Sequence, residues 1–299
     1  MTAPTLLIAN PAARHGETAR LLPVIERLLG NYPHDTAVTE CAGQATDLAA
    51  EAREYSSVVA VGGDGTAHEV LNGLMRIPAA DRPALGLIPT GSGNDTRRTL
   101  GIPDDIARAA LLLATGERRR LDVGVCNGIY FNNSISAGLD AKVTAKAVEY
   151  KATTTRSGLW LYLSAALHVL FRDLDCFHVR MGFDGAAPEP VDMLMIAATI
   201  GKTYGGGFFI TPDAEPDDGL FDVLLMDPLS LVGALTRLPF VVAGKHTRMK
   251  PMHMSRHTSL VIESDQALPA QIDGEVLLET RYDISILPGA IECIVPGAS

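Results

Sequence analysis

The chain has 299 residues, of which 47% are hydrophobic and 20% are charged. At about 100–200 residues per domain, this length predicts two domains with cores of their own, and the composition excludes disorder and collagen-like repeats. The formal net charge of -10 argues against a general nucleic-acid binder, because such proteins use excess Lys and Arg to displace counterions from phosphates. Four widely spaced cysteines form no C-x-x-C pair, so neither a zinc site nor a disulfide framework is predicted.

The first 120 residues alternate between short apolar runs and amphipathic segments. The runs predict strands at 6–9, 37–39, 57–61 and 85–88, and the segments predict helices at 19–29, 45–52, 68–75 and 106–113. Continuous apolar strands separated by helices are typical of a parallel sheet covered on both faces. Residues 1–121 are therefore predicted to form a doubly wound α/β domain.

After the three arginines at 118–120 the strands become longer and more alternating. The sequence predicts strands at 123–126, 129–136, 177–183, 191–200, 221–226, 260–263 and 282–287, and helices at 141–150, 159–172 and 229–242. Residues 122–299 are predicted to form a second, mainly antiparallel β domain, and its last residues are candidates for packing back on the first domain. The cleft between two domains is the expected ligand site.

Two glycine-rich loops follow strands of the first domain. One is Gly62-Gly63-Asp64-Gly65-Thr66 and the other is Gly91-Ser92-Gly93-Asn94-Asp95. Glycines let the backbone approach a ligand, and a helix start offers unpaired N–H groups to an anion. Asp64 would be repelled by phosphates unless it reaches Mg²⁺ or a water on it. An ordinary turn between strand and helix is the alternative interpretation, and His68 on the following helix is expected at the surface.

The second domain contains two acidic turns, Asp217-Asp218-Gly219 and Asp273-Gly274-Glu275. Carboxylates in a cleft can hold a metal ion or act as a general base. The same tripeptides are also common in simple turns between strands, so each alone indicates little.

Taken in order, these motifs resemble the diacylglycerol kinase catalytic domain family, and most closely its soluble bacterial lipid kinases, which are related to sphingosine and ceramide kinases. The resemblance covers nearly the whole chain. Beyond the loops and turns above, it includes Asn10-Pro11, Glu69, Asn72-Gly73, Leu121-Asp122-Val123-Gly124, Phe131-Asn132-Asn133-Ser134, Gly138-Leu139-Asp140-Ala141, Tyr204-Gly205-Gly206-Gly207 and Pro212-x-Ala214. It implies that residues 1–121 form a doubly wound, nucleotide-binding α/β domain and that residues 122–299 form an antiparallel β-sandwich that binds the lipid substrate, as in the NAD kinase and diacylglycerol kinase folds.

The resemblance implies ATP and Mg²⁺ as cofactors. The residues that would bind ATP are Asn10, Thr39, Gly62, Gly63, Asp64, Gly65, Thr66, Gly91, Ser92, Asn94 and Glu275. A structural Mg²⁺ would be held by the Asp218 carboxylate with the backbone carbonyls of Glu215 and Leu220. The expected catalytic residues are Asp64, Asp95, Asp273 and Glu275, and either of the last two would remove the proton from the lipid hydroxyl.

The expected function is ATP-dependent phosphorylation of a lipid hydroxyl, with diacylglycerol as the first choice of substrate and phosphatidic acid as product. Thr96 stands where these kinases usually have an apolar residue, so the lipid preference of a relative does not transfer directly. One alternative is a NAD kinase-like enzyme, which shares the Gly-Gly-Asp-Gly-Thr loop. Another is a catalytically silent lipid-binding or regulatory protein of the same fold.

The N-terminus lacks the basic and apolar regions of a signal peptide, which predicts a cytoplasmic protein. Residues 228–262 contain no Asp or Glu, and Lys142, Lys146, Lys151 and Arg156 precede the apolar run 159–171. We therefore expect peripheral contact with the inner face of the membrane through these two regions. The alternative is a solvated basic face above a helix whose Trp160 and leucines pack inward. A homodimer is expected from exposed strands of the second domain.

Overall fold

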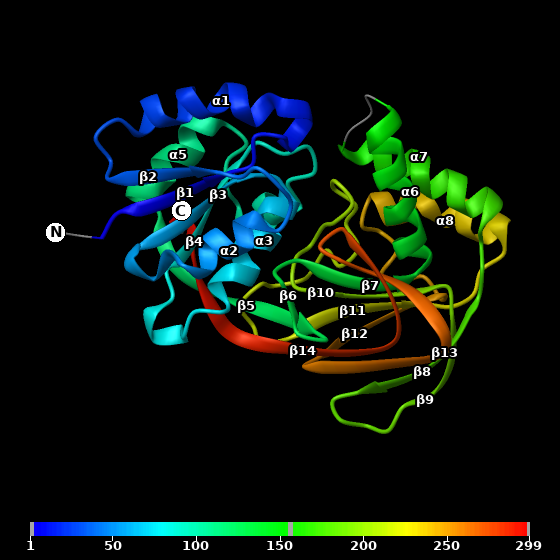
Figure 1. The fold of residues 1–299 in the computed structure, drawn as a ribbon. Helices are drawn as coiled ribbons and strands as arrows, with labels where there is room; N and C mark the ends of the chain where they lie inside the picture. Colours follow the sequence, from blue (N-terminus) through cyan, green and yellow to red (C-terminus); the bar gives the residue numbers. More distant parts are fainter. Residues whose placement is uncertain (1–2, 155–157, 298–299) are drawn as a thin grey trace. The chain divides into compact units, whose positions relative to one another are not determined.

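The computed structural model describes residues 3–154 and 158–297 (Figure 1). The chain forms two compact units, Met1–Val123 with Pro288–Ser299, and Gly124–Leu287. Two strands pass from one unit into the other, β5 (Glu117–Cys126) and β14 (Glu275–Val295). The first unit is therefore discontinuous in sequence.

The first unit is built on the parallel strands β1 (Thr5–Ala9), β2 (His34–Val38), β3 (Ser57–Gly62) and β4 (Ala84–Pro89), in the order β4-β3-β1-β2. The end of β14 pairs with β4, also in parallel, through Cys293 and Leu85. Every residue of β1, β3 and β4 is buried, which explains why these strands are continuous apolar runs in the sequence. Strand β2 is at the end of this order and is partly exposed. It stops one residue before Thr39, which was predicted to lie within it.

Helices cover both faces of this sheet (Figure 1). Helices α1 (Ala13–Leu29) and α5 (Ile106–Thr115) contact each other, and α2 (Gln44–Ala50) contacts α3 (Asp64–Leu74). The short helix α4 (Asp95–Leu100) was not predicted, and single 3₁₀ turns lie at Ala52–Glu54 and Ala79–Asp81. Arg14, His15 and Gly16 have left-handed backbone angles, so regular helix in α1 begins only after them.

Helix α3 begins at Asp64, four residues earlier than predicted, directly after the glycine pair at 62–63. It is buried along most of its length, because it contacts both strand β3 and helix α2. His68 is therefore buried, and the prediction of a surface histidine was wrong. Gly73 marks the contact with α2: a Cβ at this position would lie 2.2 Å from the Thr46 carbonyl oxygen.

The second unit is a mainly antiparallel β structure. Its principal strand order is β12-β11-β10-β7-β13, with β8 and β14 also paired to β13, β9 paired to β8, and β6 paired to β5. The strands are β6 (Ile129–Phe131), β7 (Ser134–Gly138), β8 (Phe177–Phe183), β9 (Glu189–Met193), β10 (Met195–Thr199), β11 (Phe221–Met226), β12 (Met252–His257) and β13 (Ser259–Ile272). A core that includes Phe131, Phe221 and Tyr282 lies inside the sandwich. This architecture confirms the predicted fold class.

Three helices belong to the second unit, α6 (Leu139–Thr153), α7 (Gly158–Arg172) and α8 (Leu231–Val242). Apolar residues of α6 and α7, among them Val143, Ala147, Leu161 and Ala165, form a small core of their own. Helix α7 also contacts α8. Across the ranges that the structure describes, every helix falls short of the length and apolar character needed to cross a membrane.

The packing of α2 on α3 gives a first prediction. Gly73→Ala should lower the free energy of unfolding by about 1–3 kcal/mol, because the added methyl group would overlap the backbone of α2. Gly65→Ala in the same helix is the matched control, since a Cβ at Gly65 meets no atom within 4 Å. This control should leave stability unchanged or raise it by up to about 1 kcal/mol. Urea denaturation of both variants measures the difference, and equal effects would contradict the packing argument.

Candidate active site

The candidate residues of the first unit lie at one edge of its sheet. Asn10 follows β1, Thr39 follows β2, the 62–66 loop follows β3 and the 91–95 loop follows β4. Because the four strands are parallel, all these residues lie at their carboxyl ends. The order β4-β3-β1-β2 reverses direction at β1, so Asn10 and the 62–66 loop flank the topological switch point, where open α/β sheets bind ligands.

The two glycine-rich loops pack against each other. A Cβ on Gly91 would lie 2.3 Å from the Cα of Gly63, and a Cβ on Gly93 would lie 2.8 Å from an Asp64 carboxylate oxygen. The other Asp64 oxygen accepts a hydrogen bond from the Thr96 backbone N–H at 2.9 Å. Gly62 has no room for a side chain because the Thr66 side chain fills that space. Gly63, Gly91 and Gly93 are thus required by contact between the loops, and Gly62 by contact with Thr66, rather than by the approach of a ligand that the sequence predicted.

Gly65 and the N-terminus of α3 are different. A Cβ on Gly65 would face open space, and the N-cap residue Gly63 supplies no side chain to the first-turn N–H groups of the helix. Such a helix end favours an anion through its unpaired N–H groups and its dipole. These features fit the phosphates of a nucleotide.

The other polar residues of this edge mainly hold the loops in place. The Asp95 carboxylate is buried and pairs with Arg98 at 2.8 Å. The Asn10 side-chain oxygen accepts the Ala12 N–H at 3.0 Å, and the Thr39 hydroxyl lies 3.4 Å from the Ala9 carbonyl oxygen. Ser92 is partly exposed.

Asn94 keeps one polar atom available. Its backbone is left-handed with φ of 54°, and its amide nitrogen donates to the Gly91 carbonyl at 2.9 Å. Its side-chain oxygen is buried and has no hydrogen-bond partner within the described part of the chain. A buried polar atom of this kind needs a partner, and a bound ligand can supply one.

In the second unit, Asp273 and Gly274 form the two-residue turn that joins β13 to β14, and both have positive φ. The Asp273 carboxylate accepts three backbone N–H groups, from Asn132 at 3.1 Å, Asn133 at 3.2 Å and Ser134 at 2.9 Å. Glu275 begins β14 and is exposed. The two candidate bases therefore differ: Asp273 is occupied in holding the backbone between β6 and β7, whereas Glu275 faces solvent.

A buried polar network, which sequence reasoning missed, lies behind this turn. The Gln271 side chain accepts the Gly274 N–H at 2.7 Å and donates to the Ser136 hydroxyl at 2.9 Å and to Asp140 at 3.4 Å. Ser136 donates to the same Asp140 oxygen. Burial raises the pKa of Asp140 to about 6, although the hydrogen bonds oppose this shift. The motif Gly138–Ala141 drew attention to Asp140, but nothing in the sequence indicated its partners.

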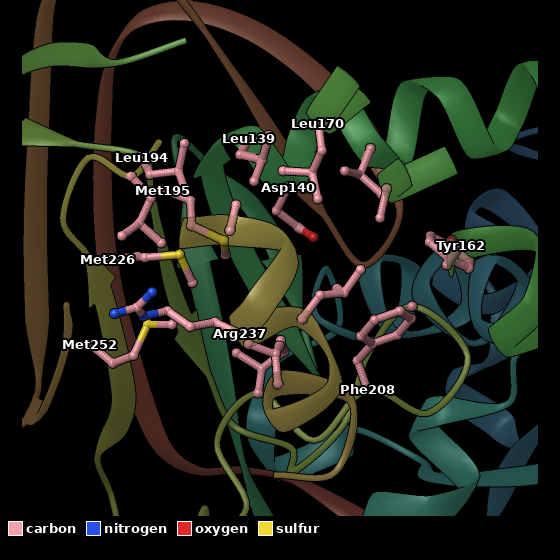
Figure 2. Close-up of a pocket in the computed structure, with 18 of the residues that line it drawn as sticks. Leu139, Asp140, Tyr162, Leu170, Leu194, Met195, Phe208, Met226, Arg237 and Met252 are labelled. Atoms are coloured by element: carbon pink, nitrogen blue, oxygen red, sulfur yellow. The ribbon is translucent and has the colours of Figure 1, made fainter. Parts of the chain in front are cut away.

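Asp140 lies on the wall of an apolar cavity of about 90 Å³ beneath helices α6, α7 and α8 (Figure 2). Figure 2 shows the Asp140 carboxylate directed into this cavity, among leucine, methionine and aromatic side chains. Arg237 also lines it and donates to the Gly233 carbonyl at 3.0 Å. The lining includes Leu139, Val143, Tyr162, Ala166, Leu170, Leu194, Met195, Tyr204, Phe208, Ile210, Met226, Leu238, Val241 and Met252. Periodicity could not predict this cavity, because its walls come from separate helices, strands and loops.

The predicted metal-binding loop lies between β10 and β11. One Asp218 oxygen accepts the Leu220 N–H at 3.0 Å, and the other pairs with Arg256. Burial, together with the carboxylates of Asp213 and Glu215, raises the pKa of the nearby Asp222 to about 6. Oxygen donors of this kind, with one buried Asp222 oxygen lacking a hydrogen-bond partner, fit a hard divalent cation such as Mg²⁺.

Both parts of the chain match known protein families. Residues 4–126 match the diacylglycerol kinase catalytic domain, and residues 133–295 match the YegS C-terminal NAD kinase beta sandwich-like domain. A diacylglycerol kinase of Bacillus subtilis (strain 168) is 33% identical over 90% of this chain and 88% of its own length. A protein of Chromohalobacter salexigens named "Probable lipid kinase YegS-like" is 30% identical over 99% of this chain and 94% of its own.

Solved structures give the same fold. A diacylglycerol kinase from Bacillus anthracis str. Sterne has a TM-score of 0.75 at 24% identity, covering 99% of this chain and 97% of that one. An NAD kinase from Archaeoglobus fulgidus in complex with ATP has a TM-score of 0.54 at 12% identity, covering 98% and 94%. Both likenesses concern the fold alone. With both domains matched in order and full-length relatives at 30% identity or more, this chain belongs to the diacylglycerol kinase catalytic domain family and carries the YegS-type C-terminal domain.

Proposed function

We propose that this protein is an ATP-dependent lipid kinase that transfers the γ-phosphoryl group to a lipid hydroxyl, with diacylglycerol as the first choice of substrate and phosphatidic acid as product. The observation that carries the proposal is the apolar cavity of the second unit, whose wall residue Asp140 is joined through Gln271 to the turn that precedes Glu275. A cavity of this chemistry suits a hydrocarbon chain. The Bacillus subtilis relative is named diacylglycerol kinase, which supports the same substrate class.

In this proposal the N-terminus of α3 and Gly65 receive the phosphates of ATP. Asn10, Thr39 and the buried amide oxygen of Asn94 complete the nucleotide side, and Asp64 faces the phosphates through a metal ion or its water. Mg²⁺, when bound, neutralises the phosphate charge. Phosphoryl transfer needs little covalent help from a protein, so positioning and charge neutralisation are the main tasks of these residues.

We assign the general base to Glu275. It removes the proton from the lipid hydroxyl while the hydroxyl oxygen bonds to the γ-phosphorus and ADP leaves. Asp273 is a positioning residue, because its carboxylate already accepts three backbone N–H groups and so fixes the turn that carries Glu275. Asp140 and Gln271 support this turn from the side of the cavity.

The two alternative functions are less well supported. A NAD kinase would have to bind a polar dinucleotide in the second unit, where the cavity is lined mainly by apolar side chains. A silent lipid-binding protein would not require an exposed Glu275 on a turn held by so many hydrogen bonds. An assay with labelled ATP distinguishes the three functions.

Purified protein incubated with labelled ATP, Mg²⁺ and dispersed diacylglycerol should place the label in a chloroform-soluble product. Label in NADP would instead identify a nucleotide kinase, and no transfer to any acceptor would leave only the binding protein.

Glu275→Gln should lower kcat about 10²–10⁴-fold and leave the urea midpoint unchanged, because the side chain is exposed. Asp273→Asn should lower the urea midpoint as well, since it weakens the three hydrogen bonds that the Asp273 carboxylate accepts from the backbone of residues 132–134. A near-normal kcat for Glu275→Gln removes this residue from the role of base.

The cavity gives a test of the lipid chain. Ala166 is buried on α7 and lines the cavity, so Ala166→Phe should fill it and raise the KM for long-chain diacylglycerol more than for a short-chain analogue. The adjacent Leu167 is 36% exposed and is not among the lining residues, so Leu167→Phe is the matched control. Thermal unfolding of both variants checks for misfolding. Equal changes of KM for the two chain lengths would place the lipid tail elsewhere.

We further propose that α7 and α8 form the face that touches the membrane. Trp160 and Phe171 on α7 are 73% and 61% exposed, and Val232 on α8 is 70% exposed. The alternative in which Trp160 packs inward is therefore not what the structure shows, although its neighbour Leu161 is buried. Residues 228–262 contain no acidic side chain, and Lys245, Arg248 and Lys250 in this range are exposed. Arg156, which was predicted to contribute to the same face, lies outside the described residues.

Co-sedimentation with phosphatidylglycerol vesicles tests this face. Trp160→Ala combined with Lys250→Glu should reduce the bound fraction several-fold, because one change removes an interfacial anchor and the other reverses a charge. Lys146 is a poorer choice, since its ammonium group pairs with Glu149 at 2.7 Å. Leu278→Ala, at an exposed apolar residue of β14, is the control and should bind as the unmodified protein does. Equal binding by the double variant would exclude the proposed face.

A further inference from the structure

The loop between β10 and β11 is strongly acidic. Five carboxylates occur within ten residues, at Asp213, Glu215, Asp217, Asp218 and Asp222. The Asp222 side chain is only 10% exposed, and one of its oxygens has no hydrogen-bond partner in the ranges that the structure describes. A buried carboxylate oxygen of this kind needs a cation or a donor.

The basic side chain of Arg256 reaches into this loop. The Arg256 guanidinium contacts the Asp218 carboxylate, and its Nε lies 3.6 Å from the orphan oxygen of Asp222. Arg256 belongs to β12 and stands directly opposite Asp222 in the antiparallel pairing with β11. The strand register therefore fixes the base of the arginine side chain beside Asp222, and from there the guanidinium reaches the Asp218 carboxylate.

We propose that Arg256 is an internal counter-ion that competes with a divalent cation for Asp218 and Asp222. The inference rests on the proposed assignment of Asp218 to a metal site and adds Asp222 to that site. Either the guanidinium or the metal ion can neutralise these two carboxylates, but not both at once, because each would approach the same oxygen atoms. The Arg256 side chain is 47% exposed, so it can swing into solvent when a metal ion takes its place.

The physical reason is electrostatic. A metal ion entering the loop is attracted by the carboxylates and repelled by the positive charge of Arg256 a few ångströms away. Removal of this charge should therefore strengthen metal binding, and a lysine at the same position should keep most of the repulsion. Without a metal ion the loop should be less stable once the arginine is removed, because the buried Asp222 carboxylate then lacks any counter-charge.

Titration of the full-length protein with Mg²⁺ alone, by calorimetry and without nucleotide or lipid, tests the proposal. Arg256→Gln should bind Mg²⁺ at least about tenfold more tightly than the unmodified protein, whereas Arg256→Lys should stay close to it. Asp222→Asn added to Arg256→Gln should abolish the gain. Arg180→Gln is the matched control, because Arg180 also projects from a strand and pairs with a carboxylate, Glu263 at 3.9 Å, away from this loop.

Thermal unfolding gives a second readout. Mg²⁺ should raise the Tm of Arg256→Gln more than that of the unmodified protein or of Arg180→Gln, since a ligand stabilises in proportion to its occupancy of the folded state. Equal Mg²⁺ affinity in the unmodified protein and Arg256→Gln, or no binding by either, would overturn the proposal, as would equal gains for Arg256→Gln and Arg256→Lys. These outcomes do not depend on kinase activity, so the proposed function can fail while this inference stands, and the reverse.

Discussion

The candidate chemistry of the second unit depends on one carboxylate that captures backbone N–H groups. Asp273 sits in a tight turn and accepts three of them from residues 132–134. Hydrogen bonds to an ionised acceptor are stronger than neutral ones, so this contact fixes the turn relative to the strands β6 and β7. Glu275 then leaves the turn in a defined direction, and Gln271 is held where it can reach Asp140. Without the hydrogen bonds of Asp273, the turn, the Gln271 network and the adjoining wall of the cavity would no longer be held in fixed positions relative to one another.

The placement of Asp140 shows a conflict between stability and function. A carboxyl group buried beside an apolar cavity is costly when ionised, and its raised pKa records that cost. A hydrophobic residue would pack there with less strain on the folded state. Perturbed carboxyl groups next to cavities are concentrated at functional sites, which agrees with the role assigned to the cavity. The hydrogen bonds that Ser136 and Gln271 donate to it keep the group oriented.

Much of the first unit could be predicted from the sequence because its strands are buried on both sides and are read directly as apolar runs. The motif series similarly indicated the family and the antiparallel second domain. Strand β12 was missed because its residues, Met-His-Met-Ser-Arg-His, form an edge strand without a clear apolar alternation. The predicted strands at 129–136 and 191–200 were each divided, because the backbone leaves the sheet near Asn132 and Leu194.

The contacts that side chains make could not be predicted from local sequence patterns. Glycines 63 and 91 are needed because two loops touch. Gln271, which donates to Asp140, and the backbone groups that donate to Asp273 lie more than 130 residues away from these carboxylates in the sequence. The direction of Trp160 and the burial of His68 depend on which face of a helix meets a neighbour, and periodicity at a helix end does not settle this. The assignment of Arg256 to the acidic loop required the register of β11 and β12.

The discontinuity of the first unit has a consequence for biosynthesis. Residues 288–297 group with a parallel sheet whose other strands, β1 to β4, all end by Pro89, and Cys293 pairs with Leu85 of β4. While the ribosome makes the intervening antiparallel segment, the edge of β4 therefore has no β14 strand to pair with. Pairing between strands so far apart in the sequence forms slowly. Nascent chains should thus pass through a stage in which an apolar strand edge needs protection from other chains, and chaperone demand is expected to fall only when the final strand emerges.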